Sequence, residues 1–177
     1  MKPYKKIVIL LNLVLVVFLF NFSVWKKEKV LAEGNLVLLK LAPVDPRSLM
    51  QGDYMELRYD FGITEAMRTP AAKRGFCVIK TDADKVGRAV RFQTGPTPLR
   101  EGEQLLRYHR SQFDIHLGAE SYFFEEGTAE SFNNARYGGL RVDDKGNSIL
   151  VGLYDEQHRL IVPRKEGKGN NTSKRAL

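Results

Sequence analysis

Carboxylates are the residues of this sequence best suited to chemistry, and they occur in two groups. Asp53 lies in the stretch GDYMELRY, residues 52–59, and Glu125 and Glu126 are adjacent in YFFEEGTAE, residues 122–130. Two carboxylates placed across a substrate can act as general acid and general base. These residues therefore define one catalytic hypothesis, a hydrolase of the cell envelope that uses carboxylates around Asp53 and Glu125/Glu126.

Structural roles explain the same residues with fewer assumptions. Gly52 suits a backbone turn, and Asp53 can accept N–H bonds that close this turn as a strand begins. Glu125 and Glu126 suit a helix N-terminus, where a negative charge is stabilised by about 0.3–1 kcal/mol. We therefore expect no catalytic residue here, and Arg58 remains a secondary candidate for recognition together with Asp53.

Metal and thiol chemistry lack the residues that they need. Cys77 is the single cysteine, so the chain forms no internal disulfide and no cysteine-based zinc site. His109, His116 and His158 lie far apart, without the spacing typical of metal ligands. We expect no metal and no cofactor, and the sequence identifies no small-molecule ligand.

The net charge of +7 belongs to the two ends of the chain. Residues 1–29 carry a net charge of +5 and residues 163–177 carry +4, which leaves −2 on residues 30–162. A nucleic-acid-binding protein needs its excess of cations on the folded surface that meets the phosphates. We therefore expect no nucleic-acid partner, and the polar residues 163–177 are predicted to be a disordered basic tail.

An uncharged run of 19 residues, Ile7 to Trp25, predicts a transmembrane anchor within residues 1–29. As a helix it is about 28 Å long, which matches a hydrocarbon core, and lysines flank it on both sides. A cleaved signal peptide is the alternative, because small residues follow at 30–32. The run is longer than a typical signal-peptide core, however, and charged residues precede that site. We expect a retained, single-pass membrane anchor with the C-terminal domain outside the cytoplasm.

Residues 30–162 are predicted to form a mainly β, antiparallel domain, sandwich- or barrel-like, with one or two short helices. The expected strands are 35–43, 54–61, 76–80, 87–94, 104–109, 112–118 and 121–124, and a hairpin turns at 143–147. The expected helices are one turn at 45–50 and a longer helix at 128–137, with Thr128 as its N-cap. The aromatic residues of 121–124 are expected in the core.

Alternation within residues 54–61 assigns the motif residues to two faces of a half-buried strand. Tyr54, Glu56, Arg58 and Asp60 fall on the polar face, and Met55, Leu57, Tyr59 and Phe61 fall on the core face. Tyr54 and Tyr59 are therefore expected on opposite sides.

GDYMELRY fits the pattern Gly-Asp-Tyr-x-x-Leu-x-Tyr, supplied by Gly52, Asp53, Tyr54, Leu57 and Tyr59. The chain resembles the GDYXXLXY family of bacterial membrane-anchored proteins, and this resemblance covers about residues 5–160. LAPVDPRSLMQGDY, SYFFEEGTAESFNNARYG and LRVDDKGNSILVGLYDE resemble further blocks of that family. The resemblance implies an envelope protein anchored in the bacterial inner membrane that works with a multi-pass membrane protein. It does not indicate whether the protein has an activity.

LMQGDYMEL is also similar to the Gly-Asp turn of signal peptidases, in which the nucleophilic serine precedes the glycine by eight residues. That position is Val44 here, or Pro43 after a one-residue insertion, and neither is a nucleophile. Ser48 is too close to the glycine, and Lys80 as a general base would have no serine to activate. A Ser-Lys protease is therefore not expected.

Overall fold

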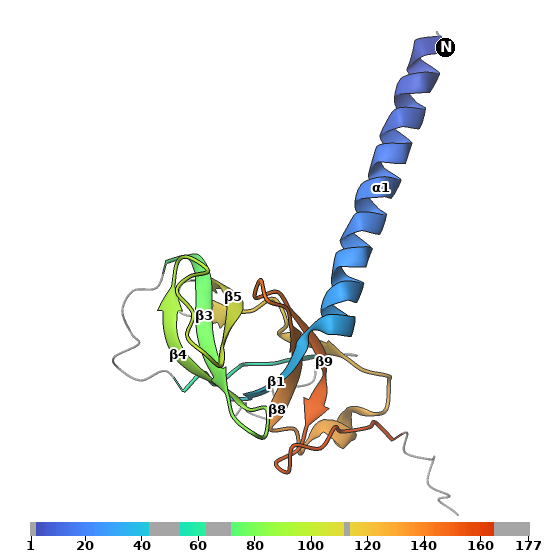
Figure 1. The fold of residues 1–177 in the computed structure, drawn as a ribbon. Helices are drawn as coiled ribbons and strands as arrows, with labels where there is room; N and C mark the ends of the chain where they lie inside the picture. The colour runs from blue at the N-terminus through green and yellow to red at the C-terminus, as the bar shows by residue number, and fades with distance from the viewer. Residues whose placement is uncertain (1–2, 43–53, 63–71, 112–113, 165–177) are drawn as a thin grey trace, which may run out of the picture.

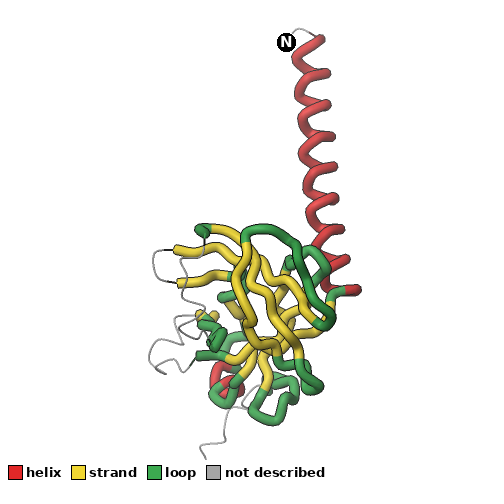
Figure 2. Tube along the Cα trace, turned by 60° about the vertical axis from the view of Figure 1, so that its left-hand side comes forward, coloured by secondary structure: helices red, strands yellow, loops and turns green. Residues whose placement is uncertain are grey.

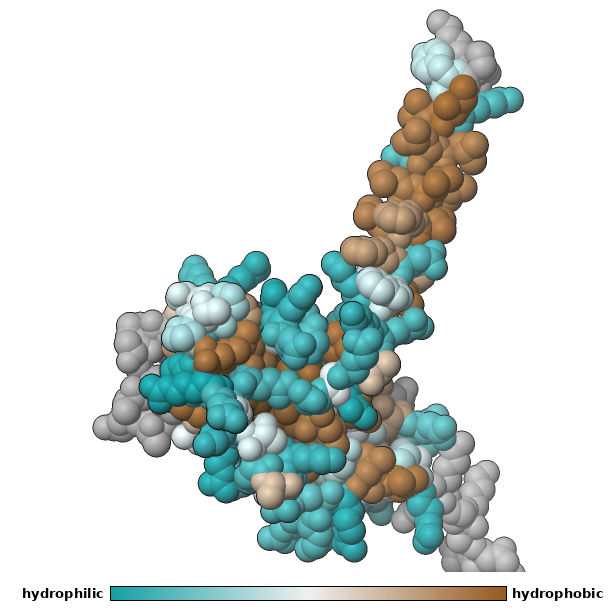
Figure 3. Space-filling view, in the orientation of Figure 1, coloured by the Kyte–Doolittle hydropathy of each residue, from teal (hydrophilic) through white to brown (hydrophobic). Residues whose placement is uncertain are grey.

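The computed structural model describes residues 3–42, 54–62, 72–111 and 114–164. The helix α1, Pro3–Glu33, projects from a β domain (Figure 1). It contains the predicted apolar run, extends past residue 29, and is long and apolar enough to cross a membrane. At 1.5 Å per residue it is about 46 Å long. Apolar side chains cover the upper part of the helix on the face seen in Figure 3, and polar side chains cover its base.

The domain is built from antiparallel strands, as predicted. One sheet has the order β1-β8-β9, with β1 Asn35–Lys40, β8 Tyr137–Val142 and β9 Ser148–Tyr154. A second sheet has the order β4-β3-β5-β6, with β3 Arg74–Thr81, β4 Gly87–Gln93, β5 Glu103–Ser111 and β6 Asp114–His116. The pair β2-β7 joins Tyr54–Glu56 to Ser121–Phe123. Figure 2 shows the strands gathered at one end of the helix.

Backbone hydrogen bonds tie the two larger sheets together at their edges. Leu38 of β1 donates its N–H to the carbonyl of Lys85 at 2.8 Å, just before β4. Arg107 of β5 donates to the carbonyl of Gly146 at 2.8 Å, in the turn between β8 and β9. The sheets therefore close around one interior instead of exposing both edges.

The core occupies this interior in two neighbouring clusters. The larger cluster combines buried side chains of β1, β3, β5 and β8: Val37, Leu39, Cys77, Ile79, Leu106, Tyr108, Leu140 and Val142, together with Phe61 and Ala119. The smaller cluster consists of Met55, Leu57, Phe132 and Leu153. Cys77, Val78 and Ile79 are all buried, because β3 is central in its sheet and is covered on both faces.

The predicted helix at 128–137 is wrong in length and type. Only a short 3-10 helix, η3 Ala129–Phe132, forms there, and the chain enters β8 at Tyr137. Thr128 does not cap it with its side chain, because its hydroxyl donates to the carbonyl of Glu125 at 2.6 Å. Phe132 is the only buried residue of this turn, so the segment lacks the apolar stripe that stabilises a longer helix.

The remaining element boundaries differ by a few residues. The strand expected at 54–61 ends at Glu56, and Tyr59 forms only an isolated antiparallel bridge with Leu41, just after β1. The strand expected at 112–118 is described only as β6. The helical turn expected at 45–50 and residues 165–177 of the expected tail lie outside the described residues.

Candidate functional site

The GDYMELRY motif is described from Tyr54 onward, and Gly52 and Asp53 lie outside the described residues. The expected faces of the strand are confirmed. Tyr54 is 41% exposed, whereas Leu57 is 3% exposed and Tyr59 packs against the core. Of the three fixed motif positions that the structure describes, Leu57 and Tyr59 therefore belong to the interior and Tyr54 to the surface.

Leu57 anchors the motif in the smaller core cluster. Its side chain packs with Met55, Phe132 and Leu153, and its backbone N–H donates to the carbonyl of Glu120 at 2.6 Å. This bond fixes the segment beyond β2 to the segment before β7. Leu57 is a structural residue by its contacts.

Tyr59 links both clusters to a buried loop. Its hydroxyl donates to the carbonyl of Ala119 at 2.5 Å, and a side chain added at Gly138 would meet its ring at 2.9 Å. Burial, and second the negative charge of Glu120, raise the pKa of Tyr59 far above that of a free tyrosine. Tyr59 thus remains a neutral hydrogen-bond donor, and β8 has a glycine where its ring needs room.

Tyr54 lies on the surface with an aromatic partner. Residue 54 is opposite Phe123 in the β2-β7 pair, and the ring centroids are 5.8 Å apart in a tilted arrangement. Phe123 is 74% exposed, although Tyr122 and Phe124 on either side pack against the core. We call Tyr54 and Phe123 the aromatic pair. The expectation that the aromatic residues of 121–124 belong to the core is wrong for Phe123.

The secondary candidates lie near this pair in the chain. Tyr54 follows Asp53 in the sequence, and its strand partner Phe123 precedes Glu125 by two residues, but Asp53 lies outside the described residues. The carbonyl of Glu125 accepts bonds from Thr128, which makes the backbone of Glu125 part of a turn. Glu126 and Arg58 are exposed.

The protease hypothesis gains no support from the described residues. Lys80, its candidate base, is exposed at the end of β3, and Ser48 lies outside the described residues.

Strand pairing brings two histidines together that the sequence separates by six residues. His109 and His116 are partners in the β5-β6 pair, and their rings stack with centroids 5.0 Å apart. Within the described part of the chain, no group of three or more His, Cys, Asp or Glu side chains is placed to hold a metal ion. Sequence spacing alone does not predict this contact, because it depends on the register in which β5 and β6 pair.

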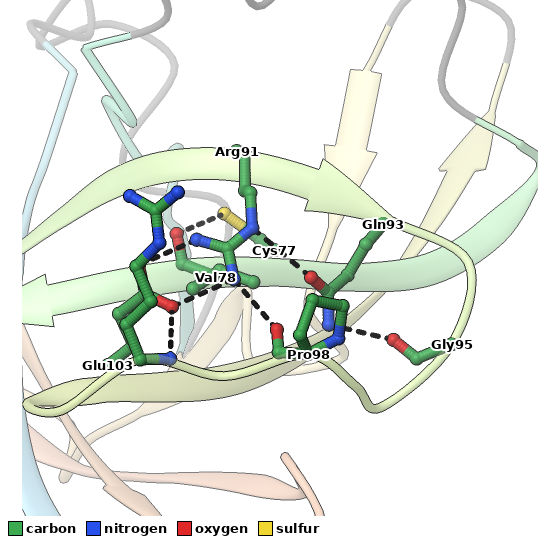
Figure 4. A network of polar contacts seen from close by, with 8 residues as sticks. Cys77, Val78, Arg91, Gln93, Gly95, Pro98 and Glu103 are labelled. Atoms are coloured by element: carbon green, nitrogen blue, oxygen red, sulfur yellow. Dashed lines mark hydrogen bonds and ion pairs between the residues drawn. The ribbon is translucent and has the colours of Figure 1, made fainter.

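The most extensive ion pair belongs to the second sheet (Figure 4). The Arg91 guanidinium donates to both carboxylate oxygens of Glu103 at 2.6 and 2.7 Å and to the carbonyl of Pro98 at 2.8 Å. Glu103 also accepts the N–H of Arg100 at 2.9 Å. The hydrogen bonds from Arg91, first, and from Arg100 lower the pKa of Glu103 to about 2. These groups hold the β4-β5 connection and have few donors left for a ligand.

Cys77 lies behind this network and carries no nucleophilic character. Its side chain is fully buried, and burial raises the pKa of the thiol to about 12.

The model of the GDYXXLXY protein family matches residues 16–153, most of the chain. The chain belongs to the GDYXXLXY family. The match spans the second half of α1 and every strand of the domain except the last residue of β9. No curated protein and no solved structure matches this GDYXXLXY protein.

Proposed function

We propose that this GDYXXLXY protein is a single-pass protein of the bacterial inner membrane whose extracytoplasmic β domain is an accessory to a multi-pass membrane protein. In this proposal α1 is retained as the anchor, and the aromatic pair is the contact surface. No catalytic step is part of it.

The observation that carries this proposal is the exposure of the aromatic pair. Tyr54 belongs to the motif that defines the family, yet 41% of it is exposed, and Phe123 beside it is 74% exposed. Neither ring is needed to fill the core clusters. Adjacent exposed aromatics are typical of protein interfaces, because large rings bury much apolar area at a low cost in conformational entropy.

The short junction between helix and domain supports a partner that is itself in the membrane. Only Gly34 separates α1 from β1, and Trp25 lies eight residues before the end of the helix, about 12 Å along its axis. A domain attached in this way stays close to the bilayer, where it meets the exposed loops of other membrane proteins.

A crosslinking experiment in native membranes tests the partner. A photoreactive phenylalanine analogue at position 123 should crosslink to an integral protein with several predicted spans, identified by mass spectrometry after carbonate washing. The same analogue at Val151, which is 38% exposed on β9, is the matched control. Equal yields at the two positions, or adducts formed only with soluble proteins, would contradict the proposed interface.

The buried cysteine permits a clean test of topology. Because Cys77 is inaccessible, a cysteine introduced at the exposed Glu126 provides the reactive thiol. We expect Glu126→Cys to react with a membrane-impermeant maleimide in intact spheroplasts. Labelling that requires lysis would place the domain in the cytoplasm and refute the proposed location.

A further inference from the structure

We infer that one edge of the β domain binds the headgroups of anionic phospholipids in the membrane that holds α1. We define the basic edge by four exposed residues: Lys73 just before β3, Arg74 at the start of β3, and Arg107 and Arg110 of β5. The inference rests on the membrane insertion of α1 in the proposed function but does not depend on a protein partner.

The backbone places these cations close together. The N–H of Arg110 donates to the carbonyl of Lys73 at 2.8 Å, and Arg74 is opposite His109 in the β3-β5 register. The register puts Arg74 and Arg107 on one face of the sheet and Lys73 and Arg110 on the opposite face, so the four cations flank the same end of β3 and β5 from both sides. Residues 73–74 and 107–110, far apart in the sequence, thus form one small cationic area.

Hydrogen bonds to β8 fix the side of the domain on which this edge lies. β8 runs toward the helix, because Val142 is opposite Asn35, the first residue after Gly34. Along β5, Gln104 donates to the carbonyl of Val142 at 3.2 Å and Arg107 bonds to Gly146 in the turn that follows. β5 therefore runs in the same sense, and its last residues extend beyond that turn toward the bilayer.

The figures agree with this assignment. In Figure 1 the start of β3 and the end of β4 lie at the upper end of the domain, toward the helix, and η3 lies at the lower end. In Figure 2 the short helix likewise lies at the end of the domain away from α1. The space-filling view has hydrophilic side chains projecting upward along this upper edge (Figure 3).

No described carboxylate forms an ion pair with a cation of the basic edge. Among the described residues, the ion pairs are Lys29–Glu33, Arg91–Glu103 and Arg159–Asp155, and none of them involves the basic edge. Arg107 donates to the carbonyl oxygen of Lys145 at 2.9 Å and its guanidinium lies over the Phe76 ring, 5.4 Å from the centroid, so none of its described partners carries a negative charge.

Acidic residues on the helix side reduce this charge without removing it. Asp143 and Asp144 lie in the β8-β9 turn, and Asp143 accepts the N–H groups of Lys145 and Asn147 within that turn. Asp114 begins β6, opposite Ser111. Glu125, Glu126, Glu130, Asp155 and Glu156 belong to the segments of η3 and of the turn after β9. Glu28 and Glu33 lie in the last turns of α1, where Glu33 pairs with Lys29 at 3.6 Å.

Helix and edge together present cations at one level of the membrane. Lys26, Lys27 and Lys29 follow Trp25 in the last turns of α1, where an interfacial aromatic residue would mark the headgroup region. The basic edge adds further cations beside these three lysines of α1. A cation close to an anionic bilayer surface strengthens binding by about fivefold, and the effect vanishes within a Debye length.

The test uses the full chain in phosphatidylcholine vesicles with spin-labelled lipids as probes. The measured quantity is the association constant of spin-labelled phosphatidylglycerol relative to that of spin-labelled phosphatidylcholine. We expect a preference for phosphatidylglycerol that falls several-fold in the Arg74→Gln/Arg110→Gln variant. The fall should stay below the roughly 25-fold limit set by two fully effective cations.

A matched double variant separates position from charge. Lys80 and Arg88 are exposed strand partners at the other end of the second sheet, about 20 Å from Arg74 along β3. Lys80→Gln/Arg88→Gln removes the same charge and should leave the preference unchanged. Any preference for phosphatidylglycerol that remains in the edge variant is attributed to the lysines of α1. For the wild type, 0.5 M salt should weaken this preference, because exposed charges are screened.

Three outcomes overturn the inference. The edge variant can retain the full wild-type preference, both double variants can lose it equally, or the wild type can show a preference that salt does not change. Vesicle flotation of the wild type is measured in parallel. A chain that does not float refutes the anchored function itself, whereas an inserted chain without lipid preference refutes only the basic edge.

Discussion

Tyr59→Phe separates a structural role of the motif from a role in recognition. The change removes a single oxygen, which donates to the carbonyl of Ala119 at 2.5 Å, and keeps the ring that packs beside Phe61 and Gly138. Ala119 is 7% exposed, so its carbonyl has little access to water as a replacement donor. The perturbation is therefore one lost buried hydrogen bond, with no cavity larger than the hydroxyl.

The expected cost follows from that geometry. Leaving a buried acceptor without its partner costs about 1–3 kcal/mol of the free energy of unfolding. For a domain of this size that corresponds to a lower thermal midpoint by about 3–12 °C. Tyr54→Phe is the matched control, because the Tyr54 hydroxyl makes no hydrogen bond to a described residue and its ring is exposed. The free energy of unfolding of Tyr54→Phe should change by no more than about 0.5 kcal/mol, as for an ordinary surface substitution.

The assay is thermal unfolding of the full chain in mild detergent, followed by near-ultraviolet circular dichroism. The crosslinking yield at position 123 is measured for the same variants at a temperature where both are folded. We expect Tyr59→Phe to lower the midpoint and to leave the yield intact. If Tyr59→Phe and Tyr54→Phe have equal midpoints, the assignment of Tyr59 as a brace between Ala119 and β8 is wrong.

Three further predictions concern groups outside the motif. Cys77 should be unreactive toward a thiol reagent in the folded chain and react fully in denaturant, since it is buried with a pKa of about 12; rapid native labelling would contradict this. Glu103→Gln should lower the denaturation midpoint at pH 7, and the difference from wild type should shrink as the pH falls from about 4 toward 2. The sign follows because the folded-state pKa is lowered to about 2, below the unfolded value near 4.3, so the stabilisation is lost as the pH falls through this window. The exposed Glu101→Gln is the matched control and should leave the midpoint at pH 7 unchanged. Gly34→Ala should cost about 1–3 kcal/mol, because its Cβ would lie 2.4 Å from a backbone oxygen of α1, whereas Gly95→Ala meets nothing closer than 3.8 Å; equal unfolding midpoints would refute the tight junction.

Sequence periodicity was sufficient for the parts of the fold that depend on burial alone. The uncharged run of α1 and the alternating faces of residues 54–61 are local patterns, and each has one simple physical solution. The same reasoning assigned Leu57 and Tyr59 to the interior and Tyr54 to the surface, as the structure has them.

The features that the sequence did not reveal depend on contacts between distant segments. Phe123 is exposed because Tyr122 and Phe124, not Phe123, face the core, and composition alone cannot choose between these two registers. His109 meets His116 only through the hairpin register of β5 and β6. The helix expected after Thr128 fails because residues 133–136 have no buried apolar stripe and lead directly into β8.

The junction at Gly34 has a mechanical consequence. Its N–H continues the helical hydrogen bonding to Val30 at 2.9 Å, the Arg141 guanidinium holds its carbonyl at 2.8 Å, and Val30 itself is buried against the domain. Transmembrane helices tilt by about 20° on average, and the angle depends on bilayer thickness. With no flexible segment to absorb such a tilt, the whole β domain must swing with the helix. Bilayer thickness would thereby set the direction in which the rings of Tyr54 and Phe123 point.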